Sequence, residues 1–281
     1  MLPVLFDKDV LREHKVNTEY KYDESTDASM TQAFSICYRY HNLMPHKLNL
    51  GRQTGNAAEV FEQENQEFAI RTPLHVTNHN YNGINEVTLG MVVSKCPHVD
   101  RLMNSATRNL LFLDKDGNSN DLATLNILRG REWGTPSYTV YRKLCDLGDP
   151  KSWYDLKDTT SETNIEKMQS VYKDVQDVDL WTGMIAETPL PGSISGATQS
   201  CLLAKHFSNI KHGDRFWYEN ENHGFKGQQL REIKKVTLAR ILCSNLGVTV
   251  MREEVFKTNS KWTRCSDIMK KGETDFKSWP K

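Results

Sequence analysis

The chain has 281 residues, enough for one large domain or two small ones with a substantial hydrophobic core. Its 36 Lys and Arg residues balance 36 Asp and Glu residues, so no overall basic charge favours nucleic acid as a partner. No apolar run approaches the roughly 18 residues of a membrane span. The opening MLPVLFDKDV lacks both the basic first residues and the long apolar run that are typical of a signal peptide.

Helical signals are much stronger than strand signals, so we expect a mainly α protein with little β structure. Residues 50–98 show no clear pattern, and the tail at about 247–281 is predicted to be irregular. Asn120 or Asp121 is the expected N-cap of one helix, and Pro136 suits the first turn of the next. The predicted helices cover residues 29–41, 99–112, 121–132, 136–147, 163–175, 179–187, 197–211 and 226–246.

Two motifs suggest metal binding but carry weak signals. DKDGNSND has the oxygen-rich composition of a calcium loop, yet Gly117 is fourth from Asp114, where an EF-hand needs its glycine sixth. His75 and His79 would share one face of a helix, but the surrounding Asn and Gly residues favour a loop. A turn and a loop are therefore the expected structures.

The stretch AFSICYRYHNLMP, residues 33–45, places His41 at the end of an otherwise apolar helical pattern. Such a histidine either binds a ligand or lies in the core with a hydrogen-bond partner. The stretch alone leaves both readings open.

Four segments resemble the animal-type haem peroxidases, the family of peroxidasin, myeloperoxidase and chorion peroxidase. LNILRGREWGTPSYTVYRKLCDL, residues 125–147, resembles the family pattern LN-x-QRGRDHG-x-P-x-Y. Residues 178–220 are similar to DLWxGGLxExPxPGxxxGPTxxCLLxxQFxxLRxGDRFWYEN, and LARILCSNLG and RNLLF match two further family helices. The resemblance implies the family's helical fold and a haem-dependent peroxidase, an oxidoreductase that uses hydrogen peroxide and a small electron donor and responds to oxidative stress.

The resemblance also implies how haem b would be held. His41 corresponds to the proximal histidine, the axial ligand of the haem iron, and Asn109 to the residue that hydrogen bonds its other nitrogen. Arg39 or Arg108 would meet a haem propionate, because the forked guanidinium suits a carboxylate.

The chain departs from the family next to this histidine. The family has F-R-F-G-H, whereas YRYH is one residue shorter, which we interpret as a deletion before His41. The shorter form also resembles the Y-x-x-H of cyclooxygenases and fatty-acid dioxygenases, where the tyrosine becomes a radical; Tyr38 would have that role. Trp133 and Glu132 replace the family's His and Asp, which puts a haem-edge role of that loop in doubt.

By the same resemblance the six cysteines form the disulfides Cys145–Cys201 and Cys243–Cys265, with Cys37 and Cys96 free. Each disulfide is worth roughly 3–4 kcal/mol by the chain-entropy model. Disulfides imply an oxidising compartment, so we expect a secreted protein despite the missing signal peptide.

The resemblance further implies that residues 1–281 are the C-terminal, proximal half of a single peroxidase domain. The family's distal histidine and arginine, its calcium site and its covalent haem links lie upstream of the segment that corresponds to His41. We therefore expect a fragment with weak or no activity alone, which would need its missing N-terminal half or another chain. The alternatives are a haem-dependent fatty-acid oxygenase and a non-catalytic adhesion or structural protein.

Overall fold

The computed structural model describes residues 2–65 and 83–279, and His75 and His79 lie outside this range. Within this range the chain forms two compact units. The first unit comprises Met1–Met44, Pro97–Asn109 and Asn120–Trp217, and the second comprises Pro45–Cys96, Leu110–Ser119 and Tyr218–Lys281. The described residues are mainly helical, which confirms the predicted fold class.

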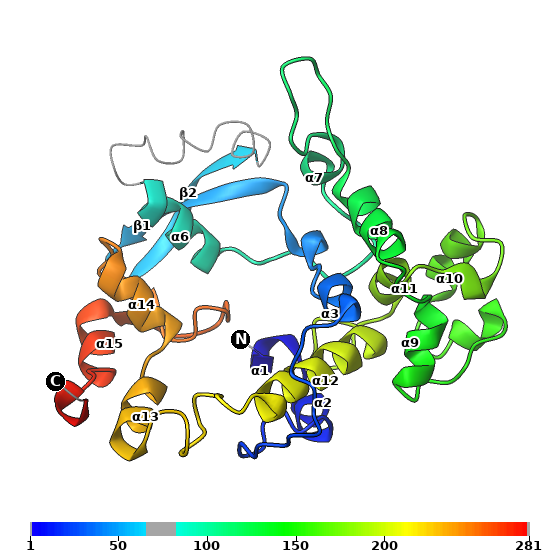
Figure 1. Cartoon of the computed structure of the whole chain (residues 1–281). Helices are drawn as coiled ribbons and strands as arrows, with labels where there is room; N and C mark the ends of the chain where they lie inside the picture. Colours follow the sequence, from blue (N-terminus) through cyan, green and yellow to red (C-terminus); the bar gives the residue numbers. More distant parts are fainter. Residues whose placement is uncertain (1, 66–82, 280–281) are drawn as a thin grey trace. The chain divides into compact units, whose positions relative to one another are not determined.

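The first unit is built from helices around one main apolar core. Its longest described helix, α12, packs against α3, and α3 also contacts α11 and α8 (Figure 1). Leu11, Ile36, Met184 and Leu203 lie at the centre of the core and are almost fully buried. The helices are α1 (Leu2–Leu5), α2 (Lys8–Glu13), α3 (Gln32–Cys37), α7 (Ser105–Asn109), α8 (Leu122–Glu132), α9 (Tyr138–Leu144), α10 (Glu162–Gln169), α11 (Leu180–Ala186) and α12 (Ala197–Gly213), with short 3-10 turns η1 (His41–Leu43), η2 (Trp153–Leu156) and η3 (Val175–Asp177).

The helix expected over residues 29–41 is much shorter in the structure. Thr31 caps α3 by accepting a hydrogen bond from the backbone N–H of Phe34, and the helix ends at Cys37. The backbone N–H of Arg39 then bonds to the carbonyl of Ile36, a tighter i→i+3 pattern. His41 consequently begins the separate turn η1, and it is not on the same continuous helix as Tyr38.

A buried polar network joins α9, α11 and α12. Glu187 accepts hydrogen bonds from the hydroxyl of Tyr138 at 2.6 Å and from the backbone N–H of Thr198 at 2.9 Å. Arg142, 1% exposed, lies 4.0 Å from the same carboxylate and pairs with Asp158 at 2.7 Å. Because each charged group has partners, the network can remain in the core.

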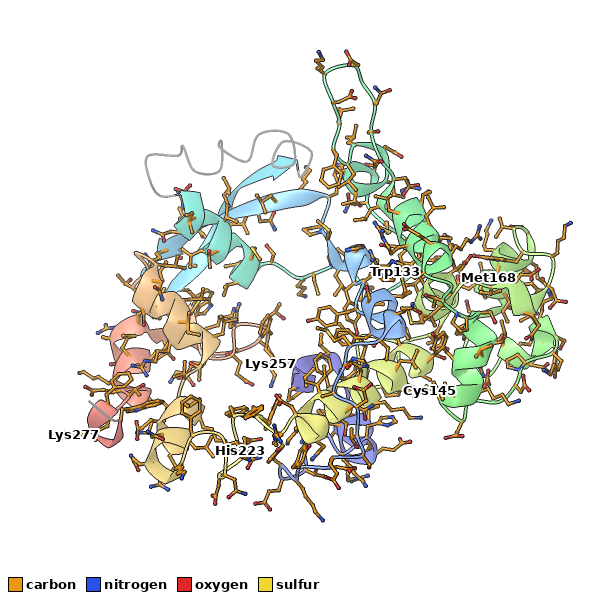
Figure 2. All side chains as sticks on the ribbon, in the orientation of Figure 1. Trp133, Cys145, Met168, His223, Lys257 and Lys277 are labelled. Carbon is orange, nitrogen blue, oxygen red and sulfur yellow. A yellow bond between two sulfur atoms is a disulfide. The ribbon has the colours of Figure 1, made fainter. Side chains whose placement is uncertain are left out.

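The structure contains both disulfides that the resemblance implied. Cys145, labelled in Figure 2, follows α9 and bonds to Cys201 on α12. The Cys243–Cys265 disulfide links α14 (Leu238–Asn245) to the start of α15 (Cys265–Lys271). Cys37 is a buried free thiol and Cys96 an exposed one.

The second unit contains a long hairpin, which we did not predict. Strands β1 (Lys47–Thr54) and β2 (Ala57–Asn65) pair antiparallel, with a register shift between Leu50 and Gly51. Helix α6 (Gly83–Val93) lies so close to β1 that a Cβ on Gly90 would fall 1.8 Å from the carbonyl oxygen of Asn49. Only glycine therefore fits at Gly90.

The helix expected over residues 226–246 divides into α13 (Gly227–Lys234) and α14. The hydroxyl of Thr237 accepts a hydrogen bond from the backbone N–H of Arg240 and so starts a new helix. The tail is not irregular: β3 (Val250–Arg252) pairs with β4 (Trp262–Arg264), followed by α15 and the turn η4 (Phe276–Ser278). Asp114 forms the expected turn, accepting hydrogen bonds from the backbone of Asp116 and Asn118.

Candidate functional site

His41 is held at the start of η1 by anchors on both sides. The neighbouring Asn42 is 2% exposed and donates from Nδ2 to the carbonyl of Asp100 at 2.7 Å. Asn104 donates to the carbonyl of Met44 at 2.8 Å. These bonds join the turn to residues 97–109 and leave the imidazole half-buried.

One of the two ring nitrogens of His41 is hydrogen-bonded within the protein. Nδ1 lies 2.9 Å from Oδ1 of Asn126, a fully buried residue of α8. Among the described residues, no hydrogen bond reaches Nε2. Burial lowers the pKa of His41, the bond to Asn126 opposes this, and the nearby Arg39 lowers it further. The neutral imidazole, the form that binds metals, is therefore favoured.

Arg39 contacts the same amide oxygen. Its Nη1 donates to Oδ1 of Asn126 at 3.3 Å, and its Nε is buried without a partner among the described residues. The indole N–H of Trp181 donates to the carbonyl of Arg39 at 3.3 Å, which ties this backbone to α11. Arg39 and His41, both from the stretch after α3, thus form one cluster with Asn126 of α8.

The asparagine that we expected beside His41 is not the one found. Asn109 ends α7 and is exposed, and so is Arg108. The Nδ1 partner is Asn126, from the LN of the segment LNILRGRE. The sequence held a signal for it, because an asparagine on the inner face of a helix needs a polar partner.

Tyr38 lies beside a second feature, a cavity of about 490 Å³. Its ring is 41% exposed and stacks on Phe34 with centroids 5.4 Å apart. Trp133, labelled in Figure 2, follows α8 and also lines this cavity. The full lining is Met30, Thr31, Gln32, Phe34, Ser35, Tyr38 and Trp133.

The residues around His41 fit a haem iron ligand. In the half-buried, neutral imidazole the lone pair of Nε2 is available to a metal ion. The other ring nitrogen, Nδ1, is hydrogen-bonded to the amide oxygen of Asn126. This pairing of a ligating nitrogen with a hydrogen-bonded one is the usual arrangement of histidine at metal centres.

The sequence matches the family model for animal haem peroxidase over residues 1–256. The chain therefore belongs to the animal haem peroxidase family. It is 30% identical to Peroxidase-like protein 3 of Lottia gigantea over 287 residues, which cover 99% of this chain and 90% of that protein. It is 36% identical to Peroxidasin homolog pxn-1 of Caenorhabditis elegans, over 87% of this chain but only 19% of that protein. The chain thus spans about a fifth of the length of the peroxidasin homologues it matches.

Solved structures share the fold. Peroxidase A from Dictyostelium discoideum superposes with a TM-score of 0.68 at 24% identity, covering 82% of this chain and 43% of that one. The fatty acid alpha-dioxygenase of Oryza sativa gives a TM-score of 0.61 at 25% identity, covering 82% and 40%. Within the described residues, no helix is long and apolar enough to cross a bilayer.

Proposed function

We propose that this chain binds haem b through Nε2 of His41 and serves as the proximal part of a peroxidase. The observation that carries the proposal is the arrangement at His41: one nitrogen bonded to Asn126 and the other free. When bound, haem supplies the iron at which hydrogen peroxide is reduced by electrons from a small donor.

The chain's own residues would bind and orient the group. Asn126 holds the imidazole ring and keeps Nδ1 engaged, which raises the basicity of the ligand. Arg108 is exposed and remains the better candidate for a propionate, since the guanidinium of Arg39 already donates to Asn126. Asn109 is no longer proposed as the partner of His41.

In this proposal the proton-transferring residues of the distal side come from another polypeptide segment. The proposal accordingly assigns weak or no turnover to the chain alone. The two disulfides support an oxidising compartment, and secretion is therefore part of the proposal.

A haem titration followed by absorbance tests this function. The wild-type chain should develop a Soret band that saturates with haem, and His41→Ala should lose most of it. His98→Ala is the matched control, because His98 is an exposed histidine of the same unit. Equal haem uptake by His41→Ala would exclude His41 as the ligand. A wild-type chain without a Soret band would support the non-catalytic alternative.

The cavity beside Tyr38 favours a second candidate, fatty-acid oxygenation. It is lined by Phe34, Tyr38 and Trp133, which an acyl chain could contact, and the chain shares its fold with a fatty acid alpha-dioxygenase. A radical on Tyr38 would abstract a hydrogen atom from the acyl chain, the phenol O–H re-forming as the substrate becomes a carbon radical that takes up dioxygen. Electron paramagnetic resonance after peroxide addition should then show a tyrosyl signal in the haem-loaded chain that Tyr38→Phe lacks. The same signal in both proteins would exclude this candidate.

A further inference from the structure

Positive charge is concentrated in the C-terminal segment of the second unit. The segment Tyr218–Lys281 contains 13 Lys and Arg residues against eight Asp and Glu residues, a formal charge of +5. The whole chain is neutral, so residues 1–217 carry 23 basic against 28 acidic residues, a charge of −5. A polyanion would therefore be attracted to one part of the molecule and repelled by the rest.

Two contacts bring the elements of this segment together. Glu232 of α13 is fully buried, and its carboxylate accepts hydrogen bonds from Nζ of Lys235 at 2.7 Å and from the backbone N–H of Asp275 at 2.9 Å. The second bond holds η4, at the C-terminal end of the ribbon in Figure 1, against α13. Nη1 of Arg240 donates to the hydroxyl of Thr274 at 2.6 Å, which ties the residues after α15 to α14.

The end of α15 lies in the same place. A Cβ on Gly272, the residue after α15, would fall 2.8 Å from Cδ of Arg240 and 3.4 Å from the carbonyl oxygen of Lys235. Lys270 and Lys271, the last two residues of α15, are therefore close to the basic residues that follow α13 and lie on α14. We call six residues of these elements and of η4, one of which is labelled in Figure 2, the basic patch: Arg231, Lys235, Arg240, Lys270, Lys271 and Lys277.

Most of the charge in the basic patch has no acidic partner. Among the described residues, Lys235 is the only member of the patch in an ion pair, and its partner is Glu232. Five of the six residues are exposed, and Arg240 is half-buried. With Glu273 and Asp275, the exposed acidic residues beside it, the patch has six basic residues against three acidic ones, a net charge of +3. Isolated surface charges are usually only solvated, but these are gathered on elements that the hydrogen bonds above hold together.

The neighbouring cavity of about 500 Å³ does not suit an anion. Lys235 and Lys271 line it, but Glu253, Glu254 and Asp267 line it too. An anionic ligand would therefore lie across the open surface of α13, α15 and η4 and would not enter the cavity. A ligand that meets several separate surface cations without a pocket is a polymer with repeated negative charges.

We propose that the basic patch binds a sulfated polysaccharide. The Cys243–Cys265 disulfide lies within the same segment and favours an oxidising compartment, where sulfated polysaccharides and not nucleic acids are the common polyanions. Lys and Arg donate charge-assisted hydrogen bonds to the oxygens of such anionic groups. The compartment rests on the proposed secretion, whereas the binding itself needs neither haem nor peroxidase activity.

Fluorescence anisotropy of a labelled heparin oligosaccharide, titrated with the full haem-free chain at several salt concentrations, tests the proposal. The wild-type chain should bind, and its affinity should fall as salt rises because binding releases counterions. The triple variant Lys270→Gln, Lys271→Gln and Lys277→Gln should bind about 100-fold more weakly, at roughly fivefold per lysine. The slope of log affinity against log salt should become shallower by about two to three.

A matched control removes the same charge elsewhere. Lys8, Lys167 and Lys173 are exposed lysines of the first unit, and none of them forms an ion pair among the described residues. The triple variant Lys8→Gln, Lys167→Gln and Lys173→Gln should change heparin affinity far less than the triple variant of the patch.

A charge-conserving variant separates binding from a structural effect. Lys270→Arg, Lys271→Arg and Lys277→Arg together keep the positive charge and should retain heparin binding. Circular dichroism checks that each variant is folded. Should the triple glutamine variant fail to fold, Lys277→Gln alone, in η4, should lose about fivefold in affinity.

The proposal is overturned when the wild-type chain does not bind heparin, or when the patch and control variants lose affinity equally. Tighter binding at the same salt to a single-stranded oligonucleotide or to phosphatidylserine vesicles would also overturn it and would assign the patch to nucleic acid or to a membrane surface. Haem titration is a separate readout. Failure of the wild-type chain to bind haem would contradict the proposed function and leave the heparin result intact.

Discussion

Nδ1 of His41 lies 2.9 Å from Oδ1 of Asn126, although 85 residues separate the two in the chain. The bond joins the turn after α3 to the inner face of α8, in the core of the first unit. A displacement of either element would break it. The site therefore depends on how these helices pack as much as on the histidine itself.

Replacement of this asparagine should weaken haem binding. Asn126→Ala removes the acceptor for Nδ1, and loss of such a partner typically costs about 10–100-fold in affinity. Asn109→Ala should have little effect, because Asn109 is exposed on α7. Spectrophotometric titration measures both, with circular dichroism to confirm folding. A larger effect at Asn109 than at Asn126 would restore the assignment made from sequence.

The stability of the chain should depend on the Tyr138 hydroxyl in the buried network around Glu187. Tyr138→Phe keeps the ring but removes the O–H that donates to Glu187 at 2.6 Å. The buried carboxylate then loses one of its hydrogen-bond donors, which should lower the free energy of unfolding by about 1–3 kcal/mol. Urea denaturation measures the change. Tyr154→Phe, at a ring 73% exposed, is the control and should change stability little; similar losses in both variants would argue against the network.

The two disulfides should stabilise the chain unequally. Cys145 and Cys201 are 56 residues apart, and Cys243 and Cys265 are 22 apart. The chain-entropy model then gives about 4 kcal/mol for the first disulfide and about 3 kcal/mol for the second. Double Cys→Ser variants of each pair, compared by urea denaturation, test this order. A greater loss from the shorter loop would mean that native-state packing, not loop closure, dominates.

Acid should destabilise the chain partly through His206. This residue is 6% exposed, stacks on Phe34 with centroids 4.4 Å apart, and its burial lowers its pKa. The unfolded chain, with an ordinary histidine pKa near 6.5, then binds the proton more tightly than the folded one. Stability should therefore fall as the pH decreases from about 6.5 through the lower folded-state pKa.

His206→Gln, the residue of the family pattern LLxxQF at this place, should reduce this acid sensitivity. Unfolding free energies at pH 7.5 and 5.5 give the comparison. His14 and His41 also have pKa values lowered by burial, so only part of the dependence should disappear. An unchanged difference between the two pH values would show that His206 does not contribute.

Some features of the fold followed from local sequence. The helix predicted over 121–132 is α8, and Asp121 caps it through hydrogen bonds from the backbone N–H groups of Ala123 and Thr124. The capping residue and the apolar spacing both act within a few residues, so both can be recognised in the sequence alone. The helices over 179–187 and 197–211 were predicted for the same reason and correspond to α11 and α12.

Other features depended on contacts between distant segments. The hairpin β1–β2 was missed because its strands are polar and gain their stability from each other and from α6. The tail was expected to be irregular, yet pairing of β3 with β4 and the disulfide at Cys265 give it structure. Neither contact leaves a periodic signal in the local sequence.

The sequence by itself determined the family, the mainly helical class and His41 as the candidate ligand, because these follow from residue types in characteristic patterns. Only the tertiary structure decided which asparagine meets that histidine and that Arg39 donates to the same oxygen. The physical reason is that hydrogen bonds require atoms about 3 Å apart. Where α3 ends and how α8 packs against it determine those distances, and both depend on the whole core.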